Sequence, residues 1–153
     1  MNYAISDVHA HTKTFEEFLE MLGPDDKVYF LGDAIDKGDG SLEVLKHVIK
    51  DKRFVFLMGN HEYMLYSWLY YSRIYDTNKE SLSDEECEFY KTLSYSAFLD
   101  YMMNDGWRTL VSYNFEGEDL KGEIFRFLSH LPLQVETNIN GREFVFVHAY
   151  PDL

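Results

Sequence analysis

Hydrophobic and polar positions alternate in blocks along the N-terminal part of the chain, and the blocks predict strands and helices in turn. Short apolar runs rich in β-forming residues predict strands at residues 2–6, 27–31 and 53–58. Between them, apolar residues recur at helical spacing over residues 12–22 and 41–50. The strands are apolar on both faces, as is typical of parallel sheets that helices cover. This pattern predicts a parallel α/β sheet.

The middle of the chain has a helical pattern, rich in aromatic residues, that extends over residues 62–113. An acidic stretch at residues 79–88 interrupts this pattern and predicts either a loop or the solvated start of a helix. Another short helix is predicted at residues 120–129, and Ser41 is a candidate N-cap of the helix at residues 41–50.

Two strand-like runs near the C-terminus, residues 134–139 and 142–147, flank the dipeptide Asn140-Gly141. Both residues of this dipeptide tolerate positive φ, so it is a strong signal for a β-hairpin. The sequence contains no internal repeat, low-complexity segment or linker. Its 153 residues match the usual size of one domain, and we predict a single domain over residues 1–153.

The composition is acidic, since 14 Lys and Arg residues oppose 27 Asp and Glu residues and leave a net charge of −13. Such a charge repels phosphate backbones and argues against direct binding of nucleic acid. The single cysteine, Cys87, excludes an internal disulfide and fits a reducing compartment. The sequence has neither signal-peptide features nor an apolar run of the roughly 18 residues that span a bilayer. We therefore expect a cytoplasmic protein without membrane contact.

Four polar clusters lie where predicted strands end. Singly, each cluster is compatible with an ordinary helix cap, turn or loop. Jointly, they are in register at the carboxyl ends of strands, the edge at which open α/β folds place their sites. Carboxylate, amide and imidazole ligands suit Mn²⁺, Fe or Zn²⁺. The residues expected to converge there are Asp7, His9, Asp33, Asn60 and His148.

The order and spacing of these clusters resemble the successive DxHG, GDxxDRG, GNHE and HAG signatures of the calcineurin-like metallophosphoesterases. The matching clusters are Asp7-x-His9, Gly32-Asp33-x-x-Asp36-Lys37-Gly38, Gly59-Asn60-His61-Glu62 and His148-Ala149. The resemblance is strongest to the phosphoprotein-phosphatase branch, with its bacterial and phage Ser/Thr phosphatases and diadenosine-tetraphosphate hydrolases. It implies an α/β fold of the αββα sandwich type with a dinuclear metal centre, here shortened at its C-terminal end.

The resemblance also implies a set of metal ligands. Asp7 and His9 would bind the first metal, and Asp33 would bridge both metals. Asn60 and His148 would bind the second. Family members carry a further histidine for the second metal beyond the HAG signature, so we expect that site to be incomplete in this chain. Mn²⁺ is the expected metal, with Fe and Zn²⁺ as alternatives.

By the same resemblance, His61 would be the general acid that protonates the leaving oxygen, and Asp36 would orient its imidazole. A hydroxide whose pKa two metals depress would attack the phosphorus in line. An alkoxide leaving group needs a proton at neutral pH, and an imidazole held by a carboxylate can supply it. Lys37 and Asn60 would contact the phosphate of the substrate.

Three residues depart from the family signatures. Ala10 replaces the Gly of DxHG, a change that is mild if the backbone there is not left-handed. Lys37 replaces the Arg of DRG and loses its bidentate fork, so phosphate binding should weaken. Tyr150 replaces the Gly of HAG and would place a bulky ring near the site. His11 is a remote candidate for the missing metal ligand.

The leading hypothesis is a metal-dependent phosphoester hydrolase that acts on a phosphoprotein, a nucleotide or a dinucleoside polyphosphate. The alternative is a catalytically weak or inactive, phosphatase-derived acidic protein, of a kind that a phage could encode. Such a protein would block a basic partner, for example a nucleic-acid-binding enzyme. His61 and Asp36 favour the enzyme, whereas Lys37 and the net charge favour the alternative. We also expect self-association or a protein partner to cover the strand at residues 144–147.

Overall fold

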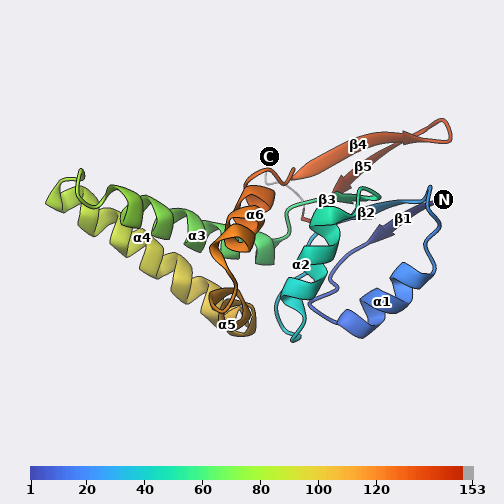
Figure 1. Cartoon of the computed structure of the whole chain (residues 1–153). Coiled ribbons are helices and arrows are strands. Elements are labelled where there is room, and N and C mark those ends of the chain that lie inside the picture. The colour runs from blue at the N-terminus through green and yellow to red at the C-terminus, as the bar shows by residue number, and fades with distance from the viewer. Residues whose placement is uncertain (150–153) are drawn as a thin grey trace.

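The computed structural model of the protein describes residues 1–149 (Figure 1), so Tyr150 lies outside the described residues. Three parallel strands form its central sheet: β1 (Asn2–Ile5), β2 (Lys27–Phe30) and β3 (Phe54–Phe56). β2 lies between the other two and is buried from its second residue onward. The sheet confirms the predicted parallel α/β arrangement and places the carboxyl ends of all three strands at one edge.

Two helices cover one side of this sheet (Figure 1): α1 (Thr12–Glu20) and α2 (Ser41–Lys50). The apolar face of α1 meets the sheet through Phe15, whose ring centroid lies 6.3 Å from that of Phe30. The prediction that Ser41 caps α2 was wrong, because Gly40 occupies the N-cap position. The Ser41 hydroxyl accepts a hydrogen bond from the Asp36 backbone N–H instead, at 2.9 Å.

A β-hairpin covers the other side of the sheet (Figure 1) and consists of β4 (Gln134–Ile139) and β5 (Arg142–Val147). Its turn confirms the predicted hairpin, with φ of 52° at Asn140 and 80° at Gly141. The hairpin is fixed to the central sheet by stacking of Tyr29 on Phe146, with ring centroids 4.5 Å apart. Helices, parallel sheet and hairpin thus form successive layers, as an α/β fold requires.

The remaining helices are α3 (Asn60–Asn78), α4 (Asp84–Met103), α5 (Trp107–Asn114) and α6 (Glu118–Ser129). α3 and α4 pair as a long hairpin that projects away from the sheet (Figure 1). The second half of the acidic stretch, residues 84–88, is the start of α4, where Ser83 and Glu86 form a capping box. Within residues 1–149, no helix combines the length and hydropathy needed to cross a bilayer.

Candidate metal centre

The loops that follow the three parallel strands are hydrogen-bonded to one another at the carboxyl edge of the sheet. The Asp7 N–H donates to the Gly32 carbonyl at 3.1 Å, and the His9 N–H donates to the Asp33 carbonyl at 3.0 Å. Gly59 lets the third loop approach closely, because a Cβ at this position would lie 2.3 Å from Asp33 Oδ1. This network brings the polar clusters of three separate segments into one site.

Several non-glycine residues of these loops have left-handed backbone conformations. Residues with positive φ are uncommon outside glycine and are strained, and such residues cluster at functional sites. At Ala10, φ is 59° and the side chain is 3% exposed, so the condition for a mild replacement of glycine is not met. The non-glycine residues of the site with positive φ are Asp7, His9, Ala10, Asp33, Asp36 and Lys37.

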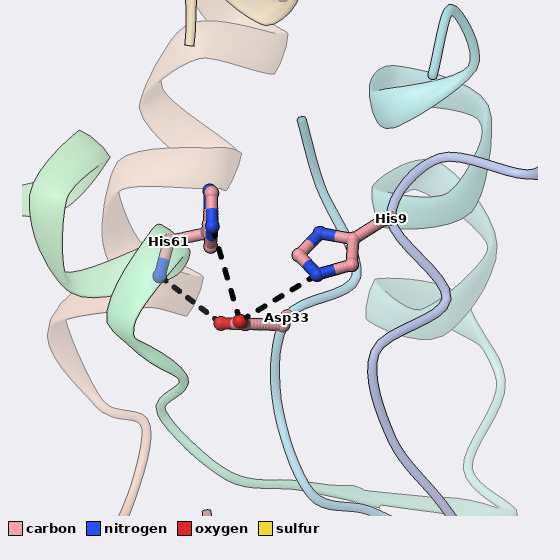
Figure 2. A group of neighbouring side chains, drawn as sticks. All are labelled: His9, Asp33 and His61. Carbon is pink, nitrogen blue, oxygen red and sulfur yellow. Dashed lines mark hydrogen bonds and ion pairs between the residues drawn. The ribbon is translucent and has the colours of Figure 1, made fainter. Parts of the chain in front are cut away.

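Asp33 lies at the centre of the site and is 3% exposed. Its Oδ2 lies 3.8 Å from His9 Nε2 and 4.0 Å from His61 Nε2 (Figure 2). The same oxygen lies 3.5 Å from His148 Nε2. One carboxylate oxygen is therefore the common neighbour of three imidazole nitrogens that come from three different segments of the chain.

Backbone carbonyls orient two of these imidazoles. His9 Nδ1 lies 3.0 Å from the Ile35 carbonyl oxygen, and His148 Nδ1 lies 2.7 Å from the Leu31 carbonyl oxygen. A carbonyl can only accept, so each Nδ1 donates its proton and a neutral ring presents its Nε2 lone pair towards Asp33. This arrangement is typical of histidines that bind metals.

Asn60 and Asp7 complete the set that the sequence predicts to converge. The Asn60 amide nitrogen, in the orientation that suits its neighbours, donates to His148 Nε2 and to Asp33 Oδ2 at 2.9 Å each. Asp7 Oδ1 lies 3.6 Å from His9 Nε2 and is more exposed than the other members. The structure therefore brings all five predicted metal ligands to one place.

The donor set fits a divalent metal. Oriented imidazole nitrogens beside a buried carboxylate are the hard and borderline ligands that suit Mn²⁺, Fe or Zn²⁺. Among the described residues, His9, Asp33 and His61 (Figure 2) form a group whose ligand atoms all lie within 4.8 Å of one another. This group contains His61, which the sequence predicts to be a general acid, so the geometry also permits His61 as a ligand.

His61 is held by a second carboxylate on the side away from Asp33. Its Nδ1 lies 2.8 Å from Asp36 Oδ2, and both side chains are buried. Burial lowers the pKa of His61, but the hydrogen bond to Asp36 and the charge of Asp33 outweigh burial and raise the pKa above its ordinary value. His61 is thus oriented by Asp36, with its Nε2 directed at the site.

Lys37 lies beside the predicted ligands. Its Nζ donates to His9 Nε2 at 2.8 Å, so the ammonium contacts the nitrogen that a metal would use. The other three histidines do not belong to this group. His47 Nε2, in α2, lies 3.1 Å from Asp51 Oδ2, and His11 and His130 are exposed.

Glu62 belongs to the GNHE signature and has a structural role in the site that was not predicted from the sequence. Its fully buried carboxylate accepts hydrogen bonds from the backbone N–H groups of Asp33, Ala34 and Gly59, at 2.7, 2.9 and 3.1 Å. Burial raises its pKa to about 7. Glu62 ties the loop after β2 to the start of α3.

Tyr101 and Thr109 are two further site residues that were not predicted from the sequence. Both hydroxyls donate to Asp36 Oδ1, and both residues are fully buried. They come from α4 and α5, 65 and 73 positions along the chain from Asp36. No local pattern of residues connects such distant positions, so only the three-dimensional structure reveals this contact.

Comparison with known proteins gives the family. The chain matches the calcineurin-like phosphoesterase model over residues 3–152. It therefore belongs to the calcineurin-like phosphoesterase family, as the order of the signatures indicated.

Two curated relatives show how far the likeness extends. An uncharacterized protein of Methanocaldococcus jannaschii is 26% identical over 149 residues, which cover 96% of this chain and 48% of that protein. A symmetrical bis(5'-nucleosyl)-tetraphosphatase of Wigglesworthia glossinidia brevipalpis is 34% identical over 83 residues, covering 52% and 30% of the two chains. This chain thus spans half or less of the length of these relatives.

A solved protein serine/threonine phosphatase from Saccharomyces cerevisiae is also similar. It matches 88% of this chain and 37% of its own length, with 16% sequence identity and a TM-score of 0.41.

Proposed function

We propose that this protein is a metal-dependent phosphoester hydrolase. The observation that carries the proposal is the position of Asp33 Oδ2, within 4.0 Å of imidazole nitrogens of His9, His61 and His148. Membership of the calcineurin-like phosphoesterase family supports the same activity.

In this proposal, His9 and Asp7 would hold one divalent metal, His148 and Asn60 would hold a second, and Asp33 would be a ligand of both. Mn²⁺ is the first metal to test, and Fe and Zn²⁺ suit the same donors. When bound, such metals polarise phosphoryl oxygens and lower the pKa of coordinated water.

His61 acts as the general acid in this proposal. Asp36 accepts a hydrogen bond from the Nδ1–H group and so fixes the ring, which leaves the Nε2–H group to give its proton to the departing oxygen. The raised pKa of His61 keeps more of the imidazole protonated near neutral pH, which supports the role. If His61 were a metal ligand instead, its removal would slow good and poor leaving groups alike.

Lys37 and Asn60 contact the substrate phosphate in this proposal. The Lys37 ammonium already faces the site through His9, and a cation at His9 would repel it. Lys37 would then be available to neutralise charge on a phosphoryl group. Because Lys provides a point charge rather than a planar fork, we expect a weaker phosphate contact than an Arg would give.

The substrate class is a phosphorylated nucleotide or protein. Tetraphosphatase relatives at 34–36% identity support dinucleoside polyphosphates as the first substrates to test, and phosphoproteins as the second. The negative charge of the molecule makes bound metal necessary to attract either substrate.

The experiment is a phosphatase assay of the purified chain with p-nitrophenyl phosphate, diadenosine tetraphosphate and a phosphopeptide, first in Mn²⁺ and then in Fe²⁺ and Zn²⁺. We expect metal-dependent turnover that Asp33→Asn abolishes. Asp25→Asn, which removes an equal charge from an exposed position, should leave turnover unchanged. No turnover with any of the three metals, or turnover that Asp33→Asn leaves intact, would contradict the proposal.

A second candidate function is that of an acidic protein that binds a basic partner. The observation that favours it is the exposure of large apolar side chains around α4 and α5, with Tyr95 62%, Met103 85% and Phe115 88% exposed. Phe144 and Val145 of β5 are also exposed, at 39% and 60%. Light scattering and binding of a hydrophobic dye test this candidate, and a monomer that binds no dye would exclude it.

A further inference from the structure

Asp36 is surrounded by hydrogen-bond donors from three helices. Its Oδ2 accepts a hydrogen bond from the Nδ1–H group of His61 in α3, with Nδ1 and Oδ2 2.8 Å apart. Its Oδ1 accepts hydrogen bonds from the hydroxyl of Tyr101 in α4, at 2.7 Å, and from the hydroxyl of Thr109 in α5. Asp36, Tyr101 and Thr109 are each 0% exposed, and His61 is 4% exposed.

The direction of each bond follows from the donors available. The Asp36 backbone N–H donates to Ser41 Oγ at 2.9 Å. Ser41 lies 2.6 Å from Thr109 Oγ1, and because the Thr109 proton goes to the carboxylate, Ser41 must donate to Thr109. A closed ring of hydrogen bonds therefore runs from the backbone of Asp36 through Ser41 and Thr109 to its own side chain.

The corner between α4 and α5 is shaped to place the Tyr101 ring. The Gly106 N–H donates to the Tyr101 carbonyl at 3.0 Å, which folds the chain back over this ring. A Cβ at Gly106 would lie 2.5–2.6 Å from ring carbons of Tyr101. The corner thus accepts the ring only because residue 106 has no side chain.

We infer that Tyr101 and Thr109 are positioning residues for the acid, since they fix the Asp36 carboxylate that orients His61. The inference rests on the proposed function. Three donors on its two oxygens restrain the plane of this carboxylate, and removal of either hydroxyl weakens the restraint at Oδ1. Because Asp36 is fully buried, loss of a donor to this charged group is costly. The helices of the projecting hairpin are therefore part of the site and not only an attachment to it.

The positioning role of Tyr101 and Thr109 can be tested by comparing hydrolysis rates for substrates with good and poor leaving groups. A p-nitrophenolate leaving group needs little protonation, whereas the alkoxide of phosphoserine needs much. A misplaced His61 should therefore slow phosphoserine hydrolysis more than p-nitrophenyl phosphate hydrolysis, and the loss should fall on kcat rather than on KM.

The test compares the two substrates in variants that keep ring and methyl packing. For Tyr101→Phe we expect kcat with phosphoserine to fall by roughly tenfold, and kcat with p-nitrophenyl phosphate to fall by less than about threefold. Thr109→Val should act in the same direction, and Thr109→Ser, which keeps the hydroxyl, should restore turnover. Tyr113→Phe is the matched control, because Tyr113 is a buried tyrosine of α5 outside this network. Equal slowing of both substrates, or none, would overturn the inference.

A second readout separates this inference from the proposed function. In wild-type protein labelled with ¹⁵N, the His61 Nδ1–H proton should exchange slowly with water, because it is buried against Asp36. Tyr101→Phe should raise this exchange rate by roughly tenfold, as loss of one hydrogen bond to a charged group allows. Tyr113→Phe should not change it. If wild type has no turnover, the proposed function fails and this measurement alone decides, with an unchanged exchange rate in Tyr101→Phe overturning the inference.

Discussion

Single residues of the candidate site hold left-handed backbone conformations that glycine would adopt without strain. Ala10 is the plainest case, because its methyl group gains no hydrogen bond and its φ is 59°. Asp and Asn side chains tolerate this region better than Ala does. The strain at Ala10 is therefore a free-energy cost that no side-chain hydrogen bond offsets.

Ala10→Gly should raise the free energy of unfolding by about 0.5–1 kcal/mol, since the left-handed penalty of about 1–2 kcal/mol exceeds the entropy cost of glycine. Urea unfolding at neutral pH measures this change. Ala97→Gly, within α4, is the control and should lower stability by about 1 kcal/mol. A loss of stability in both variants would show that Ala10 is not strained.

Asp51 has a lowered pKa mainly because of its ion pair with Arg53. Arg53 donates to both carboxylate oxygens, from Nε at 3.0 Å and from a terminal nitrogen at 2.6 Å. These bonds lower the pKa of Asp51 from 3.8 to about 2. A carboxylate with a lowered pKa contributes stability above the unfolded pKa and loses that contribution as pH falls through the folded one.

Asp51→Asn should therefore destabilise the protein most at pH 6 to 7, and the difference from wild type should shrink as pH falls from about 5 to about 2. Urea unfolding at several pH values tests this. Asp25→Asn, at an exposed position, controls for the change in net charge. A difference that stays constant down to low pH would mean that the Arg53 contact does not hold in solution.

At the scale of elements, Gly106 sets the corner between α4 and α5. Gly106→Ala should lower the free energy of unfolding by about 1–3 kcal/mol, because the new methyl group overlaps the Tyr101 ring in a packed region. Gly122→Ala is the matched control, since no atom lies within 4 Å of a Cβ there and α6 continues through it. This control should be more stable than wild type by about 0.5–1 kcal/mol. Equal effects of the two variants would contradict the close packing of the corner.

The elements that sequence alone could predict are those with a strong local period. The parallel strands, α2 and the hairpin at Asn140 follow from apolar runs and turn residues. The Ser41 cap was wrong because its hydroxyl is engaged by Asp36 and Thr109, a tertiary contact that overrides the usual local preference. Of the two interpretations of residues 79–88, the start of a helix is correct from Asp84 onward, because Ser83 and the acidic residues that follow it favour a helix N-terminus.

The same distinction holds for the site. Asp7, His9, Asp33, Asn60 and His148 could be predicted to converge because each follows a strand. The hydroxyl groups around Asp36 could not, because they come from helices whose packing is specified only by the whole fold. Long-range contacts of this kind leave no period or spacing in the sequence.

For the whole molecule, the net charge of −13 determines what the site can attract. Without cations, the field of the protein opposes the approach of a phosphoester, and the clustered carboxylates repel one another. Divalent metal would reduce both effects at the place where the loops meet. Metal binding, stability of the site and catalysis therefore all depend on Asp33.

The most direct test is a Mn²⁺ titration of the 153-residue chain. The electron paramagnetic resonance signal of free Mn²⁺ measures binding, and turnover of p-nitrophenyl phosphate is measured in the same samples. The account predicts that wild type binds Mn²⁺ and that turnover rises with the bound fraction. Asp33→Asn should weaken binding by at least about tenfold and abolish turnover. Mn²⁺ binding that Asp33→Asn leaves unchanged, or a wild type saturated with Mn²⁺ that hydrolyses nothing, would contradict it.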